Sequence, residues 1–479
     1  MASAKLSLLT FMAITSLLLH SSLQSRTLQS TNPHFQLLDV STSIQQALNT
    51  LSQTPDTTLL QDDTKTTPLF NNLNNSSFSV PLYSRETVKP ADHKDYKSLV
   101  LSRLARDAAR VKSLNSKLGL ELETQDLSTP VVSGTSQGSG EYFSQLGLGT
   151  PSKTMHLAID TGSDVSWVQC KPCTDCYKQT DPIYDPSASS TYQAVSCSAP
   201  TCQALDRPSC NAASVCQYQV SYGDGSFTTG DLVTDKVSLG NTGTIPKLAI
   251  GCGHDNEGLF VGSAGLLGLG GGALSFPSQI KATSFSYCLP DRNSRTASTL
   301  DFNSARPRDS ITTQLTKNAK IDTFFYVGLT GLSVGGRSLQ ISPSLFQIDS
   351  AGSGGIIVDS GTSITRLRSE AYTALRDAFR SYTTNLPSAG AVSLFDTCYD
   401  LSSMTSVKVP TVGFVFGGGK SLSLPAKNYL IPVDSSGTFC FAFAGTRSAL
   451  SIIGNVQQQG IRVSYDLANS LVGFSPAKC

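Results

Sequence analysis

Two short motifs of the same type, Ile159–Ser163 and Val358–Thr362, constrain the fold of this chain more than any other feature. Each follows an apolar stretch and places an aspartate, then a hydroxyl residue, then a glycine that permits a tight turn. An apolar segment closed by glycine comes later after each copy, at 264–268 and at 452–454. One Asp-Thr-Gly is an ordinary turn signal, but a repeat that includes the surroundings predicts two diverged copies of one lobe.

The two motifs supply one carboxylate each, Asp160 and Asp359. Like charges held close together cannot both ionise easily, so two facing carboxylates share one proton. Such a pair keeps one acid and one base in the same site. We therefore predict that Asp160 and Asp359 form a catalytic dyad that uses no metal and no other cofactor.

Composition favours a mostly β protein. Only 15% of the 479 residues are charged and 39 are glycine, which suits short strands joined by turns. The length predicts two or three structural units. A net charge of +1 implies no basic surface for nucleic acid, so we expect no nucleic-acid partner.

The first residues are typical of a signal peptide. Lys5 precedes an apolar run at 6–19 that is too short to span a bilayer, and small polar residues follow it. We expect residues 1–25 to be removed, and we expect no stable membrane insertion. The last residues, 475–479, carry no retention tetrapeptide and no lipid-anchor tail. The expected route is the secretory pathway to the extracellular space, with the endoplasmic reticulum and the vacuole as alternatives.

Cysteine usage agrees with an oxidising compartment. All the cysteines follow the first motif and their number is even, which predicts up to six disulfides. The alternative is zinc, because Cys-x-x-Cys is also a ligand spacing. Spacing alone leaves the connectivity open. The twelve residues are Cys170, Cys173, Cys176, Cys197, Cys202, Cys210, Cys216, Cys252, Cys288, Cys398, Cys440 and Cys479.

The segment between the signal peptide and the first lobe differs in character. Residues 26–90 are rich in Ser, Thr, Asn and Gln, so we expect them to be loosely ordered. Asn74 and Asn75 begin two overlapping N-glycosylation acceptors. Residues 96–118 then alternate leucines with lysines and arginines at helical spacing, which predicts a basic helix.

The layout from about 141 to 479 resembles the pepsin-like aspartic proteases, and within them the plant nepenthesin-like branch. The motifs that carry the likeness are the two Asp turns, Cys170-x-x-Cys173-x-x-Cys176, Tyr222–Ser226 and Ile452–Gln459. The resemblance implies an all-β, bilobal double β-barrel with the active-site cleft between two homologous lobes. It also implies the boundaries. We expect a prosegment at 26–127, a first lobe at 128–330 with a Cys-rich insertion at 170–216, and a second lobe at 331–479.

The resemblance assigns roles to the motif residues. Thr161 and Ser360 would lock the two loops together, while Ser163 and Thr362 would bond the outer carboxylate oxygens. The Asp-Gly signal at 224–225 predicts a hairpin. In the family that hairpin is the flap over the substrate, which makes Tyr222 its tyrosine and Trp167 the partner of that tyrosine. By the same likeness, we expect Cys288 to pair with Cys479 and Cys398 with Cys440.

Three interpretations of the basic helix remain open: a solvated helix, a helix on a membrane surface, or an inhibitory prosegment lying over an acidic cleft. The resemblance favours inhibition. A lysine near both carboxylates at neutral pH would keep both ionised, and acid would weaken that pairing. Cleavage near 124–135 would then free the mature enzyme.

The expected activity is hydrolysis of polypeptides by an acid-active, monomeric aspartic endopeptidase. One ionised carboxylate, by family analogy Asp160, takes a proton from a water while the protonated partner, Asp359, hydrogen-bonds the scissile carbonyl. The alternative is a catalytically silent binding protein of the same fold, such as an inhibitor of cell-wall-degrading enzymes.

Overall fold

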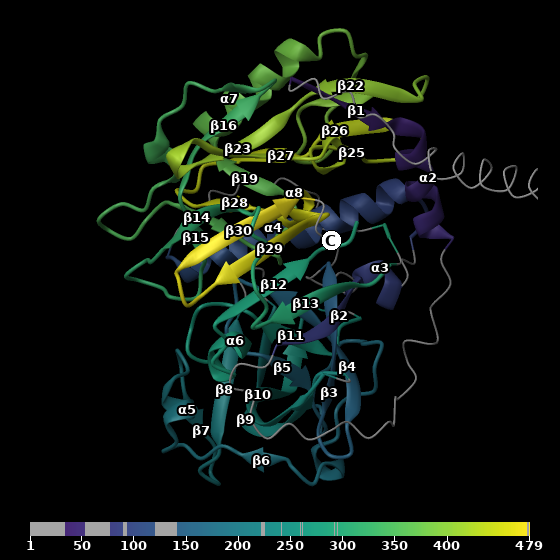
Figure 1. Cartoon of the computed structure of the whole chain (residues 1–479). Coiled ribbons are helices and arrows are strands. Elements are labelled where there is room, and N and C mark those ends of the chain that lie inside the picture. The colour runs from purple at the N-terminus through teal and green to yellow at the C-terminus, as the bar shows by residue number, and fades with distance from the viewer. Residues whose placement is uncertain are drawn as a thin grey trace, which may run out of the picture.

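The computed structural model describes residues 34–52, 77–89, 93–119, 141–221, 226–240, 242–258, 260, 262–291, 293–294, 296–476 and 479. Two β lobes lie one above the other, with helix α4 between them (Figure 1). The fold is mostly β and bilobal, as predicted. Its helices are α2 (Val40–Leu51), α3 (Arg85–Val88), α4 (Tyr96–Lys117), α5 (Pro200–Gln203), α6 (Phe276–Gln279), α7 (Ser369–Tyr382) and α8 (Asn455–Gln458).

The first lobe, at the bottom of Figure 1, is built around the long antiparallel pair β9 and β10. Strand β11 runs parallel to β4, which ends at Asp160. The strands are β3 (Tyr142–Leu148), β4 (Lys153–Asp160), β5 (Trp167–Gln169), β6 (Gln193–Ala194), β7 (Ser209–Cys210), β8 (Cys216–Ser221), β9 (Phe227–Ser238), β10 (Thr244–Glu257) and β11 (Gly265–Gly268).

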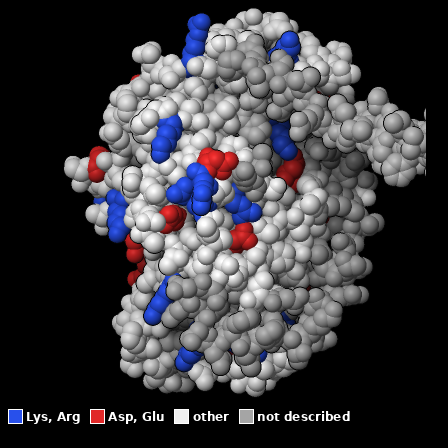
Figure 2. All heavy atoms as spheres, viewed as in Figure 1, with Lys and Arg blue, Asp and Glu red and all other residues white. Residues whose placement is uncertain are grey.

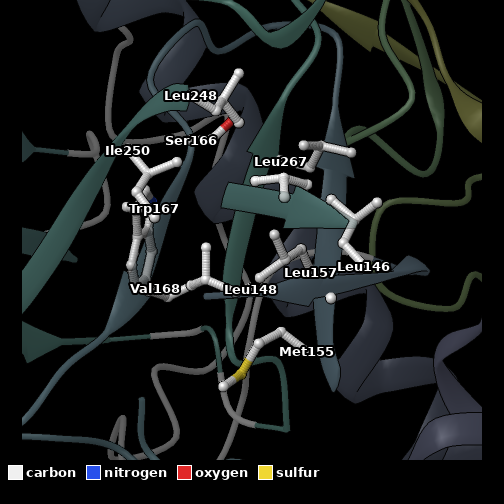
Figure 3. A pocket seen from close by; sticks show the side chains of 12 residues that line it. Leu146, Leu148, Met155, Leu157, Ser166, Trp167, Val168, Leu248, Ile250 and Leu267 are labelled. Carbon is white, nitrogen blue, oxygen red and sulfur yellow. The ribbon is translucent and has the colours of Figure 1, made fainter. Parts of the chain in front are cut away.

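The core of the first lobe lies behind the strand that carries Asp160. Figure 3 shows apolar side chains from β3, β4, β5, β10 and β11 pointing toward one another around a small cavity. Met155 and Leu157 line it from β4, and Trp167 lines it from β5. Residues 155–160 of β4 are all buried, and pairing with β3 on one side and β11 on the other holds Asp160 at the strand's end.

A sheet between the lobes joins them. Its strand order is β3, β2, β13, β12, β29, β30, β14, so segments from both lobes and from upstream of the first lobe hydrogen-bond in one layer. Besides β3, the strands of this sheet are β2 (Phe78–Ser84), β12 (Ser284–Cys288), β13 (Ser298–Phe302), β14 (Ile311–Thr316), β29 (Ile461–Asp466) and β30 (Leu471–Pro476).

The second lobe repeats the essential arrangement of the first. Strand β28 runs parallel to β18, which leads into Asp359, as β11 runs parallel to β4. The remaining strands are β15 (Tyr326–Val327), β16 (Leu329–Val334), β17 (Arg337–Ser338), β18 (Ile356–Val358), β19 (Thr365–Arg368), β20 (Ser388–Ala389), β21 (Cys398–Asp400), β22 (Ser406–Pro410), β23 (Val412–Phe416), β24 (Lys420–Ser423), β25 (Leu430–Pro432), β26 (Thr438–Phe441), β27 (Phe443–Thr446) and β28 (Ser451–Ile453).

The prediction that residues 26–90 are loosely ordered is wrong for the described part. Strand β1 (Phe35–Asp39) pairs with β22, helix α2 follows it, and β2 lies between β3 and β13. These short apolar strands lie in a polar stretch and obtain their hydrogen bonds and burial from distant parts of the chain. The average composition of residues 26–90 therefore did not reveal them.

All twelve cysteines are paired in disulfides. The pairs Cys288–Cys479 and Cys398–Cys440, expected from the resemblance, are confirmed. The thiols of the Cys-x-x-Cys spacing that suggested zinc are bonded to each other or to Cys252. The other four pairs are Cys170–Cys252, Cys173–Cys176, Cys197–Cys210 and Cys202–Cys216.

Removing the two sulfurs of Cys170–Cys252 should cost much more stability than removing those of Cys173–Cys176. The first bond closes a separation of 82 residues and the second a separation of three. The loop-entropy model gives about 4 kcal/mol for the first pair and about 2 kcal/mol for the second. Denaturant unfolding of the two Cys→Ser double variants measures both losses, and equal losses would contradict the prediction.

Candidate active site

Asp160 and Asp359 come from corresponding positions of the two lobes. Asp160 ends β4 beside Gly268, and Asp359 follows β18, whose last residue pairs with Ile453. The two apolar segments closed by glycine therefore lie beside the two aspartates, as the repeat predicts. Both carboxylates are buried, and the structure brings them together at the junction of the lobes.

Reciprocal hydrogen bonds hold the two turns together. The amide of Thr161 donates to Ser360 Oγ at 3.2 Å, and the amide of Ser360 donates to Thr161 Oγ1 at 3.0 Å. Each hydroxyl also reaches the opposite strand, because Thr161 Oγ1 donates to the carbonyl of Val358 and Ser360 Oγ to that of Ile159. The exchange relates the two loops by approximate two-fold symmetry and fixes the separation of the aspartates.

A second pair of hydroxyls lies on the outer oxygens of the aspartates. Thr362 Oγ1 donates to Asp359 Oδ2 at 2.6 Å, and Ser163 Oγ donates to Asp160 Oδ2. The amide of Gly162 donates to Asp160 Oδ1 at 2.9 Å. One hydroxyl therefore lies on each carboxylate, and the supporting roles that the resemblance assigns to these residues stay a prediction.

The guanidinium of Arg110, in helix α4, lies between the two carboxylates. Its Nε and Nη2 donate to Asp359 Oδ2 and Oδ1 at 3.1 and 3.0 Å, and Nη2 also donates to Asp160 Oδ1. Of the three interpretations of the basic helix, this contact favours the inhibitory prosegment, with an arginine in the place where the argument from sequence considered a lysine. A planar guanidinium can donate to two carboxylates at once, whereas an ammonium is a point charge.

Further ion pairs fasten α4 on both sides of Arg110. Arg106 donates to Glu141 Oε1 from Nε and Nη2 at 3.0 and 2.6 Å. Asp107 accepts from the amides of Ser363 and Ile364 and is paired with Arg366 of the second lobe. The helix therefore contacts both lobes through buried charges, and these partners, far away in sequence, had no local signal that could have found them.

Apolar contacts also hold α4 in place between the lobes. Val111 and Leu114 pack in one cluster with Phe324 and with Leu450 of the second lobe. Lys117 donates to the carbonyl of Gly162 at 3.0 Å, so the end of the helix reaches the first catalytic turn. The helix thus covers the candidate dyad with both charged and apolar side chains.

Burial and the neighbouring cations act in opposite directions on the carboxyls. Burial by itself would raise the pKa of Asp359, but the charge and hydrogen bonds of Arg110 outweigh it and hold the pKa below its ordinary value. The pKa of Glu141 is likewise lowered, because Arg106 and Arg103 outweigh burial. For Asp107, burial dominates and its pKa is raised despite Arg366.

Acid should therefore release α4 through Glu141 and Asp359. A carboxyl whose pKa is depressed in the docked state stabilises docking above its ordinary pKa, and this contribution is lost as pH falls through the depressed value. The window lies below about pH 4. Asp107 has the opposite sign, since a raised pKa favours the docked state as pH falls.

Glu141→Gln should shift the midpoint of acid-induced release of α4 to higher pH. It removes one partner of a buried ion pair, which weakens docking of α4 at neutral pH by about 3 kcal/mol, and it removes one acid-sensitive contribution. Asp107→Asn is the comparison: it should weaken docking at neutral pH without removing a contribution that is lost in acid. Hydrogen exchange of the α4 amides at each pH, measured by mass spectrometry, gives the midpoint. An unchanged midpoint in Glu141→Gln would contradict this account.

The flap cannot be compared at its tip, because Tyr222 and residues 223–225 lie outside the described residues, as do Asn74 and Asn75. The arms are present as predicted, with Ser221 of β8 paired to Phe227 of β9. Trp167 is buried, and its ring contacts Phe260 at 5.0 Å between centroids.

Two amide side chains support the second turn from below. Gln458 Nε2 donates to the carbonyl of Asp359 at 3.2 Å, and Asn455 Nδ2 donates to that of Ser360 at 2.9 Å. Tyr287 in turn donates to Gln458 Oε1 at 2.6 Å. Both residues belong to the motif Ile452–Gln459, which the sequence singled out, but their hydrogen bonds to the second Asp turn could not be derived from the sequence.

The fold and the site define a class. Two carboxylates on two-fold-related turns, at the junction of two β lobes, are the arrangement of pepsin-like aspartic proteases. Two family models match the chain: "Xylanase inhibitor N-terminal" over residues 142–302 and "Xylanase inhibitor C-terminal" over 324–476.

Curated relatives give the family. Aspartyl protease family protein 2 of Arabidopsis thaliana is 54% identical over 80% of this chain and 81% of its own length. Protein ASPARTIC PROTEASE IN GUARD CELL 2 of the same plant is 43% identical over 87% of this chain and 92% of its own. Aspartic proteinase nepenthesin-1 of Nepenthes gracilis is 43% identical over 71% and 79%. The chain belongs to the plant aspartyl protease family, and the nepenthesin-like resemblance is confirmed.

Solved structures show the same fold. The crystal structure of edgp superposes with a TM-score of 0.61 at 19% identity, over 84% of this chain and 95% of that one. Conglutin gamma, a basic 7S globulin from lupine seeds, gives 0.56 at 19% identity, over 70% and 92%.

Proposed function

We propose that this chain is an aspartic endopeptidase made as a zymogen, in which Asp160 and Asp359 are the catalytic dyad and α4 blocks them. The observation that carries the proposal is the Arg110 guanidinium bonded to both carboxylates. The cation held there lowers the pKa of Asp359 and so favours its ionised form, whereas the reaction needs one carboxyl of the pair protonated. The same helix excludes substrate from the dyad.

The mechanism follows from the pair once α4 has left. The ionised carboxylate takes a proton from a water between the two, and the water attacks the peptide carbonyl. The protonated carboxylate hydrogen-bonds that carbonyl, and a proton then passes to the leaving amine. By family analogy Asp160 starts ionised and Asp359 protonated, although the titration belongs to the coupled pair. The hydroxyls of Ser163 and Thr362 orient the carboxylates throughout.

Residues 1–25 would be the signal peptide and 26–127 the prosegment, followed by lobes at 128–330 and 331–479, with Tyr222 as the flap tyrosine. Six disulfides suit the secretory pathway, and we propose the extracellular space as the destination. In the described residues no helix has the length and apolarity to cross a membrane. On the face in Figure 2, acidic and basic side chains are intermingled. The mature enzyme would act as a monomer on extended polypeptides.

The test is digestion of a denatured protein by the secreted full chain, acidified to about pH 3 to 5, with and without pepstatin. Acid-dependent cleavage that pepstatin abolishes would support the proposal. A folded, processed protein that is inert across the acid range would contradict it. That outcome would favour a binding protein of the same fold, the function that the name of the matching family models suggests.

A further inference from the structure

The β1–α2 segment, residues 34–52, is bound to the second lobe in a different way from α4. In Figure 1 β1 lies beside β22 at the top of the molecule, whereas α4 crosses between the lobes. Strand β1 pairs antiparallel with β22 along its whole length, from Phe35 opposite Pro410 to Asp39 opposite Ser406. Within the described part of the chain, β22 pairs with no strand except β1, so the segment completes its ladder.

Backbone hydrogen bonds extend the ladder at both ends. The amides of Val40 and Ser41 donate to the carbonyl of Thr405 at 3.0 and 3.2 Å. At the other end, the amide of Thr411 donates to the carbonyl of His34 at 3.0 Å. The segment therefore adds a strand to the edge of β22 and is hydrogen-bonded at both of its ends. Sheet edges bind extended peptides in this way.

The side-chain amide of Gln36 forms hydrogen bonds with the adjoining backbone through both its nitrogen and its oxygen. Its Nε2 donates to the carbonyl of Leu424 at 2.8 Å, and its Oε1 accepts from the amide of Ala426 at 3.0 Å. The ring of Phe35 packs edge-on against Tyr382 at 5.8 Å. These contacts fix the register of the segment on the lobe.

Alternate residues of β1 have opposite surroundings. Leu38 is 3% exposed and belongs to the main core, together with the fully buried Val40. Its neighbour Leu37 is 65% exposed. Ala47 of α2 is buried against Ile431 of the second lobe, in a cluster that also includes residues of α4. One face of the segment is thus part of the lobe's core.

Charge distinguishes this segment from α4. Residues 34–52 contain two ionisable side chains, His34 and Asp39, and Asp39 caps α2 of the same segment by accepting from the amide of Thr42 at 2.8 Å. The ladder, the Gln36 contacts and the apolar face do not titrate. Acid that breaks the carboxylate pairs of α4 therefore leaves the ladder and the Gln36 contacts of this segment unchanged, and departure of α4 removes only its share of the cluster around Ala47.

We propose that activation removes α4 from the cleft but leaves residues 34–52 bound non-covalently to the edge of β22, so that the mature enzyme carries them as a second chain. The proposal rests on the zymogen function proposed above. It also identifies the β22 edge as a docking site for an extended peptide with a Gln at one position and a buried leucine two positions later.

The first test is to activate the full chain by acid and pass it over a sizing column at the same pH. Mass spectrometry of the denatured enzyme peak should find a peptide that contains residues 34–52, in an amount equivalent to the enzyme. Activity without that peptide would overturn this inference and leave the proposed function standing. Elution as a dimer after loss of the peptide would also overturn it, with a second copy as the occupant of β22.

A second test does not depend on activity. In an Asp160→Asn chain, a specific protease site placed between residues 53 and 76 is cut at neutral pH, and the protein is then acidified. The segment should stay in the enzyme peak, and its dissociation would overturn the inference. If acid never elicits activity from the wild type, the proposed function fails. The cut Asp160→Asn chain still shows whether residues 34–52 stay bound.

A matched pair of variants tests the surface itself. In the synthetic peptide 34–52, Leu38→Asp should lower affinity for the activated, peptide-depleted enzyme by about 100-fold, because it buries a charge in place of a leucine. Leu37→Asp should change affinity by less than about threefold, because that side chain is exposed. Using peptides avoids a folding defect in the chain, and equal effects of the two changes would refute the assigned docking face.

Discussion

Replacing Asp160 by Asn should lower kcat of the activated enzyme by about 10²- to 10⁴-fold, which is the usual contribution of a positioned acid or base. Asn keeps the shape of the side chain: its Oδ1 can still accept from the amide of Gly162, and its Nδ2 can donate to the hydroxyl of Ser163, so the turn should stay intact. It cannot take a proton from water, however, and the shared-proton state is lost. The measurement is the initial rate on a peptide substrate after complete processing by an added protease.

Asp255→Asn is the matched control, since this aspartate lies in β10 outside the candidate site. Its kcat should stay near that of the wild type. Intact disulfides and unchanged thermal unfolding in both variants would show that a difference in kcat reflects catalysis and not a folding defect. A kcat for Asp160→Asn within about tenfold of the wild type would remove this residue from the dyad.

Arg110→Met should abolish latency. The change leaves two buried carboxylates without their shared cation, so one of them takes up a proton and the dyad adopts its reactive state even at higher pH. Breaking a buried ion pair on one side costs about 3 to 5 kcal/mol, so α4 should also leave the cleft far more readily. We expect the unprocessed variant to cleave peptide substrate, and to process itself, at a pH at which the wild type is inert.

Lys112→Met provides the control on the same helix. It removes the same charge two residues away, but Lys112 is exposed, so latency should be unchanged. Arg110→Lys should be intermediate, because an ammonium cannot reproduce the three hydrogen bonds of the guanidinium. If Arg110→Met remained as latent as Lys112→Met, the block would lie in the bulk of α4 and not in its charge.

Local and repeated features were predictable from sequence. The two Asp turns and the flanking glycine-closed strands were found because each lobe repeats the same short pattern, and the roles of the hydroxyl residues came from the family resemblance. The basic helix, expected at 96–118, is α4 at Tyr96–Lys117, since helical periodicity is a local signal.

Features that depend on pairing between distant residues were not predictable. Nothing near Arg110 in sequence distinguishes it from the lysines of the same helix, and only its position over both carboxylates shows which cation acts. Glu141 and Arg366 became part of the site only through contacts with α4. Strand β1 was missed for the same reason, because its partner β22 lies in the last third of the chain.

The most direct test of the central claim, that α4 and its Arg110 hold the dyad inactive until acid releases them, is pulse-labelled hydrogen exchange of the wild type. Amides of residues 96–117 should be protected at neutral pH and should lose protection below about pH 4, before any cut in the chain is detected and as activity appears. Activity that develops while these amides stay protected would contradict the account.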